Sequence, residues 1–163
     1  MKTASCLLVW LTLLPMVREQ APRSTTESPA IAASGAFFAL SVADIDASAK
    51  WYSEKLGLKV VMQTPKRDHA AVTVLEGGGL IVELIQHDGA VPLGKAAPAL
   101  KGNLFVHGMF KAGVLVDDFE KTLAMLKERG VEFFIGPFPA RANQRANVII
   151  KDNAGNLIQF FGK

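Results

Sequence analysis

Hydrophobic and polar residues alternate in several short stretches of this chain, and one such stretch occurs twice. Residues 37–45 and 111–119 each alternate, and a helical pattern follows Asp44 in the first and Asp118 in the second. Alternation with a period of two indicates a strand with one buried face. An aspartate at this point favours a helix N-cap, because its carboxylate can accept hydrogen bonds from the N–H groups of the first turn.

Each predicted helix has apolar residues on one side, at the period of about 3.6 residues that is typical of an amphipathic helix. The first helix is predicted to end at Gly57 and the second at Gly130. Glycine is the residue that most readily takes the left-handed conformation of a helix C-cap. A further strand is predicted after each glycine, at 59–63 and at 132–135.

Both halves of the chain then end in a predicted hairpin. The turns lie at 76–79 and 152–156, and both are rich in glycine or asparagine, as hairpin turns usually are. The hairpin strands are predicted at 71–75, 80–85, 147–151 and 157–161. The order strand–helix–strand–strand–strand thus occurs twice, at an offset of roughly 75 residues.

This repeat predicts an α+β domain over residues 35–163. Its two tandem βαβββ modules are placed at about 37–86 and about 105–162, joined by a loop that contains glycine and proline. The chain has 163 residues. That length suffices for one domain with its own hydrophobic core and is too short for two.

The N-terminal part follows a different pattern. Residues 1–17 contain Lys2 and then an apolar run that is too short for a comfortable membrane span but typical of a signal peptide. Residues 18–34 are polar and without periodicity, which predicts a flexible linker. We therefore expect export to the periplasm or the medium. Small residues at the usual cleavage spacing are missing directly after the run, so an uncleaved membrane anchor and a misassigned start codon remain alternatives.

Composition and charge narrow the classes of function. Apolar residues make up 50% of the chain and charged residues 20%, which is the balance of an ordinary globular protein. The net charge of +3 comes from scattered lysines and arginines, so nucleic-acid binding is not expected. Cys6 is the only cysteine, and it lies in the signal-like run. Removal of that run would exclude disulfides, thiolate catalysis and cysteine metal sites.

The segments Ala39–Leu58 and Lys151–Gln159, in this order of elements, resemble the vicinal oxygen chelate superfamily. That superfamily includes glyoxalase I, bleomycin-resistance proteins and extradiol dioxygenases. The resemblance extends over nearly everything from Phe37 to Phe161. It implies that the two modules form an eight-stranded, open, barrel-like sheet around a cleft, with the helices outside.

The resemblance also implies where a metal ion would bind. Metal enzymes of the family take one ligand from the first strand and one from the last strand of each module. The corresponding positions here are Phe37, Glu83, Lys111 and Gln159. Only Glu83 keeps a family ligand, and one carboxylate with one amide does not make the three or four donors that a divalent metal needs. We therefore expect no metal and no other cofactor, which argues against glyoxalase I and dioxygenase chemistry.

Strand alternation predicts an apolar cleft with one anionic, one cationic and one amide group. The residues predicted to line it and contact a ligand are Phe37, Ala39, Ser41, Ile81, Gly113, Leu115, Gln159 and Phe161. Such a lining suits a small aromatic or carbonyl compound. The predicted function is therefore metal-free binding of a small apolar or aromatic molecule, of the bleomycin-resistance kind.

The alternative is an enzyme, such as a lyase, an isomerase or a dioxygenase-like protein. Glu83 and Lys111 are the candidate catalytic residues, as an acid/base pair, with Lys111 as an amine nucleophile, or beside an atypical metal site. A structural ion pair between Glu83 and Lys111, in place of the lost metal, explains the same residues.

Other polar residues carry less information. The stretch Thr64–Asp68 is predicted to be a loop, and the three histidines are expected at the surface or in loops. Arg141 and Arg145 are either exposed surface residues or a clamp for an anionic substrate. The expected partner is a small molecule, with no membrane contact beyond the signal-like segment. A homodimer is an alternative to a monomer, because family members often dimerise, sometimes by exchanging modules.

The metal prediction can be tested directly. We expect elemental analysis of the purified protein to find no stoichiometric divalent metal, because only Glu83 of the four implied ligand positions is a carboxylate. Stoichiometric metal that is lost in Glu83→Ala would contradict this prediction.

Overall fold

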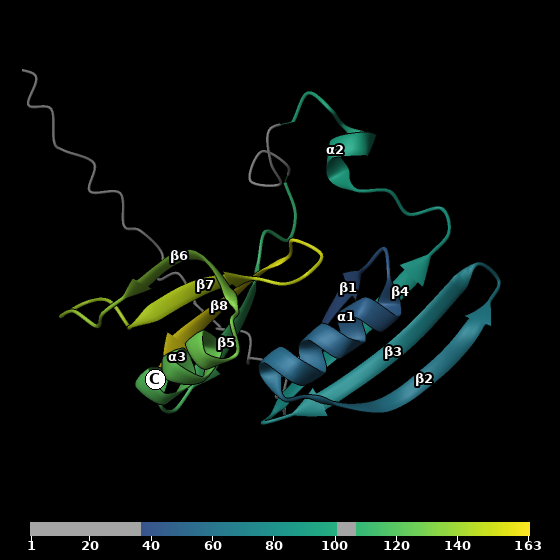
Figure 1. The fold of residues 1–163 in the computed structure, drawn as a ribbon. Coiled ribbons are helices and arrows are strands. Elements are labelled where there is room, and N and C mark those ends of the chain that lie inside the picture. Colours follow the sequence, from purple (N-terminus) through teal and green to yellow (C-terminus); the bar gives the residue numbers. More distant parts are fainter. Residues whose placement is uncertain (1–36, 101–106) are drawn as a thin grey trace, which may run out of the picture. The chain divides into compact units, whose positions relative to one another are not determined.

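The computed structural model describes residues 37–100 and 107–163 (Figure 1). The predicted signal-like segment 1–17 and linker 18–34 lie outside the described residues, as does the predicted start of the second module. Within the described ranges, no helix is both long and apolar enough to cross a membrane.

The first module has the predicted order of elements, and its four strands form one sheet. Its elements are β1 (Phe38–Ser41), α1 (Ile45–Trp51), a π-helical turn η1 (Tyr52–Leu56), β2 (Lys59–Arg67), β3 (Ala70–Gly77) and β4 (Leu80–His87). The strands lie in the order β1-β4-β3-β2, with β1 parallel to β4 and the other neighbours antiparallel.

The second module repeats this topology. A short helix α2 (Leu93–Ala96) precedes it, and its elements are β5 (Ala112–Val116), α3 (Phe119–Glu128), β6 (Glu132–Phe138), β7 (Asn147–Lys151) and β8 (Leu157–Gly162). The strand order is β5-β8-β7-β6, with β5 parallel to β8. The α+β repeat is therefore confirmed. The eight strands form two open four-stranded sheets rather than one continuous sheet.

The register shows that the two modules are equivalent residue by residue. Ala39 pairs with Glu83 in the first sheet, and Gly113 pairs with Gln159 in the second. Each pair lies in the parallel contact between the first and the last strand of its module. Glu83 and Gln159 thus occupy the same place in their respective sheets.

The predicted helix caps are confirmed. The Asp44 carboxylate accepts a hydrogen bond from the N–H of Ala47 at 2.9 Å, and Asp118 accepts one from the N–H of Lys121 at 2.9 Å. At the other ends, Gly57 has φ 74° and Gly130 has φ 62°. A residue with a β-carbon is strained at such angles, so glycine suits both positions.

The loop predicted at Thr64–Asp68 is wrong for most of its length, because β2 continues through Arg67. β2 is an edge strand that pairs only with β3, and its register shifts between Thr64 and Arg67. An edge strand tolerates Pro65 because its open side needs no N–H donor. The turn itself consists of Asp68 and His69, which both have positive φ angles.

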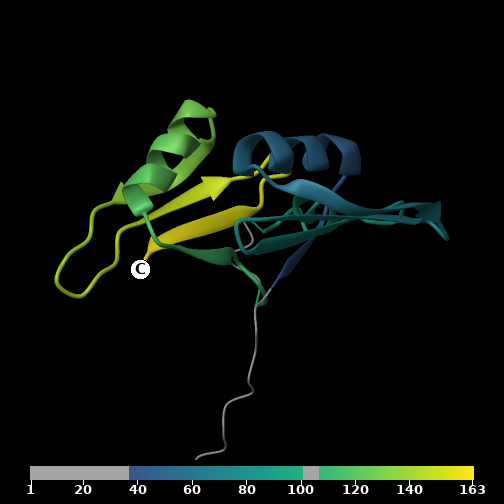
Figure 2. The ribbon, with the colours of Figure 1, turned by 90° about the horizontal axis from the view of Figure 1, so that it is seen from below.

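Each module packs its helix against one face of its sheet (Figure 2). The inward-facing side chains of β4, such as Val82 and Leu84, belong to the same hydrophobic cluster as Leu123 of α3 and Ile150 and Ile158 of the second sheet. Burial of this shared apolar surface stabilises both modules together.

A buried hydrogen bond connects the modules. The Tyr52 hydroxyl, at the end of α1, donates to Asp152 Oδ2 in the β7–β8 turn at 2.8 Å. Tyr52 is 0% exposed and Asp152 is 5% exposed. Asp152 also accepts from the N–H groups of Ala154 and Asn156 and from the Asn156 side chain, so its carboxylate is fully used.

The ends of the two main helices make a second contact between the modules. Lys55 Nζ donates to the backbone carbonyl of Arg129, and Arg129 Nη1 donates to the carbonyl of Lys55 at 3.0 Å. The last carbonyl groups of a helix lack partners within the helix. Each module therefore supplies a cation to the helix end of the other, where the helix dipole favours positive charge.

We expect Tyr52→Phe to lower the free energy of unfolding by about 2 kcal/mol, because it removes a buried hydrogen bond to a charged group. Burial, together with the charge and hydrogen bond of Asp152, raises the pKa of Tyr52 well above its usual 10.0. Above pH 10 the unfolded chain therefore loses a proton that the folded protein keeps, and stability falls as the pH rises.

Tyr52 is the only tyrosine, so tyrosinate absorbance reports this group alone. The wild type should develop that absorbance only as it unfolds, and urea titrations of Tyr52→Phe should lack this component of the alkaline loss of stability. Tyrosinate formation near pH 10 in the folded protein would contradict the prediction.

Candidate functional site

One face of the first sheet is open and mainly apolar. Phe37 is 63% exposed, and Ile81 and Met62 are exposed as well. The opposite face carries Phe38, Val82 and Leu84, which are buried in the core. The predicted orientation of the two faces is therefore confirmed for β1 and β4.

Glu83 lies in the middle of this open face. Its register partners are Ala39 on β1 and Val74 on β3, and Met62 lies beyond Val74 on β2. Glu83 is half-buried, and its carboxylate has no hydrogen bond or ion pair within the described ranges. The face thus holds one unpartnered negative charge among apolar side chains.

Three residues of this face are not predicted as site residues from the sequence. Met62, Val72 and Val74 all lie in strands that the sequence predicts, at 59–63 and 71–75, but the sequence alone does not assign them to the site. The alternation within 71–75 places Val72 and Val74 on one face of their strand. The pairing of β3 with β4 then sets Val72 beside Ile85 and Val74 beside Glu83.

The corresponding face of the second sheet is different. Leu115 is 58% exposed and Gly113 is also exposed, but Gln159 is only 6% exposed. Leu157 and Ile149 on this face are buried too. Gln159, expected at the surface of a cleft, is therefore a buried residue, and Phe161 beside it is half-buried.

Gln159 is part of a short chain of hydrogen bonds. Its Nε2 donates to Asn147 Oδ1 at 2.9 Å, and Asn147 Nδ2 donates to the backbone carbonyl of Arg145 at 3.0 Å. Gln159 Oε1 is buried and has no hydrogen-bond partner. Most buried polar atoms do have one, so this oxygen needs an explanation.

Lys111 is exposed and directly precedes β5. Its Nζ lies 5.9 Å from the centre of the Phe110 ring. Within the described part of the chain, no ion pair joins Lys111 to Glu83. Lys111 thus lies just before the first strand of the second sheet and Glu83 within the first sheet, and the two do not form the structural ion pair that the sequence left open.

The four positions implied for a metal do not fit one. Phe37 has no donor atom, Lys111 is cationic, and Gln159 uses its amide nitrogen to hold Asn147. Among residues 37–100 and 107–163, no group of three or more His, Cys, Asp or Glu side chains could hold a metal ion. Glu83 and one amide oxygen are too few donors for a divalent ion.

The histidines do not supply a replacement set, since His69, His87 and His107 are all exposed. His69 lies at the β2–β3 turn, where its Nδ1 is 3.4 Å from Asp88 Oδ2. The hydrogen bond from Lys66 lowers the pKa of Asp88, with a smaller contribution from His69. The surface prediction for the histidines is therefore confirmed.

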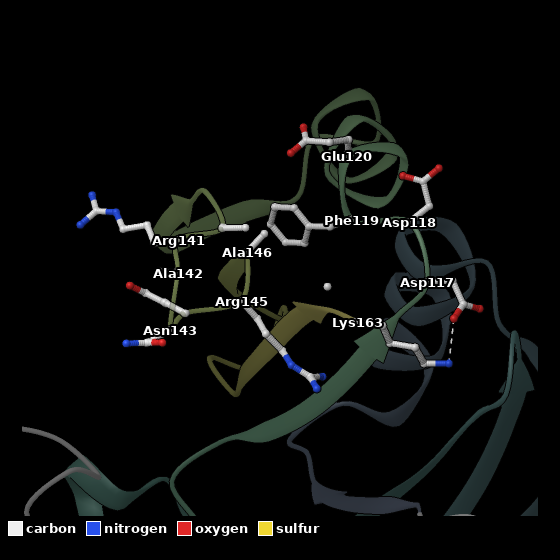
Figure 3. Close-up of a pocket in the computed structure, with 13 residues that line it drawn as sticks. Asp117, Asp118, Phe119, Glu120, Arg141, Ala142, Asn143, Arg145, Ala146 and Lys163 are labelled. Carbon is white, nitrogen blue, oxygen red and sulfur yellow. Dashed lines mark ion pairs between the residues drawn. The ribbon is translucent and has the colours of Figure 1, made fainter.

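A cavity of about 770 Å³ lies in the second module, beside the start of α3 (Figure 3). It is lined by the β6–β7 loop and carries three acidic and three basic groups: Asp117, Asp118, Glu120, Arg141, Arg145 and Lys163. Asp117 Oδ1 lies 2.7 Å from Lys163 Nζ, and the two residues form an ion pair. The Arg141 and Arg145 side chains extend in different directions, so they do not form the clamp considered from the sequence.

We expect Glu83→Leu to raise the free energy of unfolding by about 1 kcal/mol, because a half-buried carboxylate without a partner is costly among apolar side chains. Urea unfolding measures this. Glu76→Leu, at an exposed position of β3 on the same sheet, is the control and should change stability by less than about 0.5 kcal/mol. A marked loss of stability in Glu83→Leu would show that Glu83 has a structural role.

Comparisons with known proteins agree with this fold. The family model described as the glyoxalase/bleomycin resistance protein/dioxygenase superfamily matches residues 36–160. No curated protein sequence matches the chain.

Solved structures of this fold are similar over most of the chain. A glyoxylase/bleomycin resistance protein/dioxygenase domain from Frankia sp. EAN1pec is 20% identical with a TM-score of 0.62, covering 80% of this chain and 98% of that one. TnmS3, an antibiotic binding protein from Streptomyces sp. CB03234, is 20% identical with a TM-score of 0.58, covering 83% and 98%. Glyoxalase I from Zea mays is 18% identical with a TM-score of 0.57, covering 77% and 43%.

At these identities the structural likeness shows the fold alone, but the family model covers well over half of the chain. The chain therefore belongs to the glyoxalase/bleomycin resistance protein/dioxygenase superfamily.

Proposed function

We propose that this protein binds a small apolar or aromatic molecule on the exposed apolar surface of its sheets, without the divalent metal ion of the family's enzymes. The observation that carries the proposal is the open face of the first sheet, where apolar side chains surround the unpartnered Glu83. Contiguous exposed apolar surface with a few polar groups is typical of ligand sites.

The face offers flat apolar contact and one charged group. Ala39 is small, so a ligand can approach Glu83 from the β1 side, while Val74 and Ile81 supply apolar contact. An aromatic ring system that buries about 100 Å² here gains roughly 2.5 kcal/mol. Glu83 then orients the ligand by accepting a hydrogen bond or by pairing with a cationic group.

The relatives are compatible with this function. TnmS3 is an antibiotic binding protein, and this chain spans 98% of its length.

Two further expectations belong to this proposal. The apolar run that follows Lys2 supports export, so the protein would meet its ligand outside the cytoplasm. Exposed apolar residues on the edge strands, such as Val61 on β2 and Phe134 on β6, support a homodimer.

The proposal is tested by protein-observed NMR titration with a panel of one-ring and two-ring aromatic compounds, some of them amines. We expect binding in the millimolar to micromolar range and shifts confined to the open faces. Ile81→Lys should weaken binding about tenfold or more, because the new ammonium group covers apolar surface and pairs with Glu83.

Met125→Lys is the matched control, because Met125 is an exposed apolar residue on α3, away from the open face. It should bind the panel as the wild type does. If no compound of the panel binds, or if Ile81→Lys and Met125→Lys behave alike, the proposal is wrong.

A further inference from the structure

Gln159 presents an unusual feature for a residue at a ligand position. It is more than nine-tenths buried, and its Oε1 has no hydrogen-bond partner. An unpaired buried carbonyl oxygen destabilises the folded protein, because it has lost its hydrogen bonds to water without gaining another. Gln159 lies at the position equivalent to Glu83. Its Oε1 becomes favourable only when another group donates the missing hydrogen bond to it.

The hydrogen bonds around Gln159 fix which atom is left free. The carbonyl of Arg145 can only accept, so it must face the Nδ2 of Asn147. Asn147 Oδ1 then points to Gln159 and must receive the Nε2 donor. Turning the Gln159 amide round would bring two acceptor oxygens together. The free atom is therefore an acceptor, and it can be satisfied only by an N–H or O–H group.

There is room for such a group beside Gln159. Its register partner on β5 is Gly113, which is exposed. A β-carbon built on Gly113 would have no atom within 4 Å. The missing side chain thus leaves open space over Gly113, bordered on β5 by the exposed Leu115. Gln159 Oε1 itself has almost no accessible surface, so a donor reaches it from this side when the side chains around it move apart.

We propose that Gln159 Oε1 accepts a hydrogen bond from an N–H or O–H group of a ligand seated over Gly113, so that the protein selects aromatic ligands that carry a donor. This inference rests on the proposed function and specifies its ligand. Glu83, the equivalent residue of the first sheet, is also an acceptor. Glu83 and Gln159 therefore both favour ligands with a hydrogen-bond donor. The sequence also predicts ligands with a carbonyl group, but a carbonyl oxygen is an acceptor and can satisfy neither residue.

Two pairs of near-isosteric probes test this selectivity: indole with benzothiophene, and phenol with toluene. The first member of each pair carries one donor that the second lacks. In NMR titrations of the wild type, indole and phenol should bind about tenfold more tightly than their partners, since an unpaired buried acceptor costs that much. The Gln159 side-chain amide signal should shift with indole and phenol only.

Two variants locate the effect, and both are made in a Glu83→Leu background so that Glu83 contributes no preference for hydrogen-bond donors. Gln159→Met removes the acceptor at similar volume, and it should make the members of each pair bind equally. Gly113→Val keeps Gln159 and fills the gap, and valine suits a strand position where nothing lies within 4 Å of the β-carbon. It should abolish the preference for donors. Gln63→Val, at an exposed strand position whose register partner Thr73 lies on the opposite face of the first sheet, is the control and should keep the preference.

The outcomes separate this inference from the proposed function. Equal affinities within each pair in the wild type would show that water satisfies Gln159 Oε1, and this would overturn the selectivity while leaving ligand binding intact. A preference for donors that persists in Gly113→Val would also overturn it. Binding of no probe at all would overturn the proposed function, and the inference with it.

Discussion

The hydrogen bond from Tyr52 to Asp152 holds the end of α1 in the first module against the β7–β8 turn of the second. Both groups are buried, so neither can exchange its partner for water without opening the contact between the modules. The bond depends on Asp152 being fixed by its own turn, where Ala154 and Asn156 occupy its remaining lone pairs. A repeat of two similar modules thereby becomes one cooperative core.

This contact makes the two modules unequal, although their topology is the same. The helical position equivalent to Tyr52 in the second module is Leu126, eight residues after Asp118 as Tyr52 is after Asp44, and it is simply part of the core. The sheets differ in a similar way. Glu83 lies half-buried on an open face, whereas the equivalent Gln159 is buried and bonded to Asn147. A charged carboxylate tolerates partial exposure, while a neutral amide can be enclosed at lower cost.

The difference has a functional consequence. A family that holds metal ions between its modules needs matched donors in both, and this chain supplies one carboxylate and one amide whose nitrogen is occupied. What remains are two hydrogen-bond acceptors at equivalent positions, each next to a small residue, Ala39 or Gly113. This arrangement supports the proposed recognition of a ligand by contact area and by hydrogen-bond donor groups.

Pattern and residue type along the chain are enough to predict the order of elements, the N-caps at Asp44 and Asp118, the glycine C-caps and the lack of the family's metal ligands. These features depend on neighbouring residues or on residue type, so a single chain reveals them. The folded structure is needed to see that Val72, Val74 and Met62 join Glu83 and that Lys111 does not pair with it. It is also needed to see that Gln159 is enclosed with one unpaired oxygen. These facts depend on strand register and on burial by distant segments, and alternation along one strand contains information about neither.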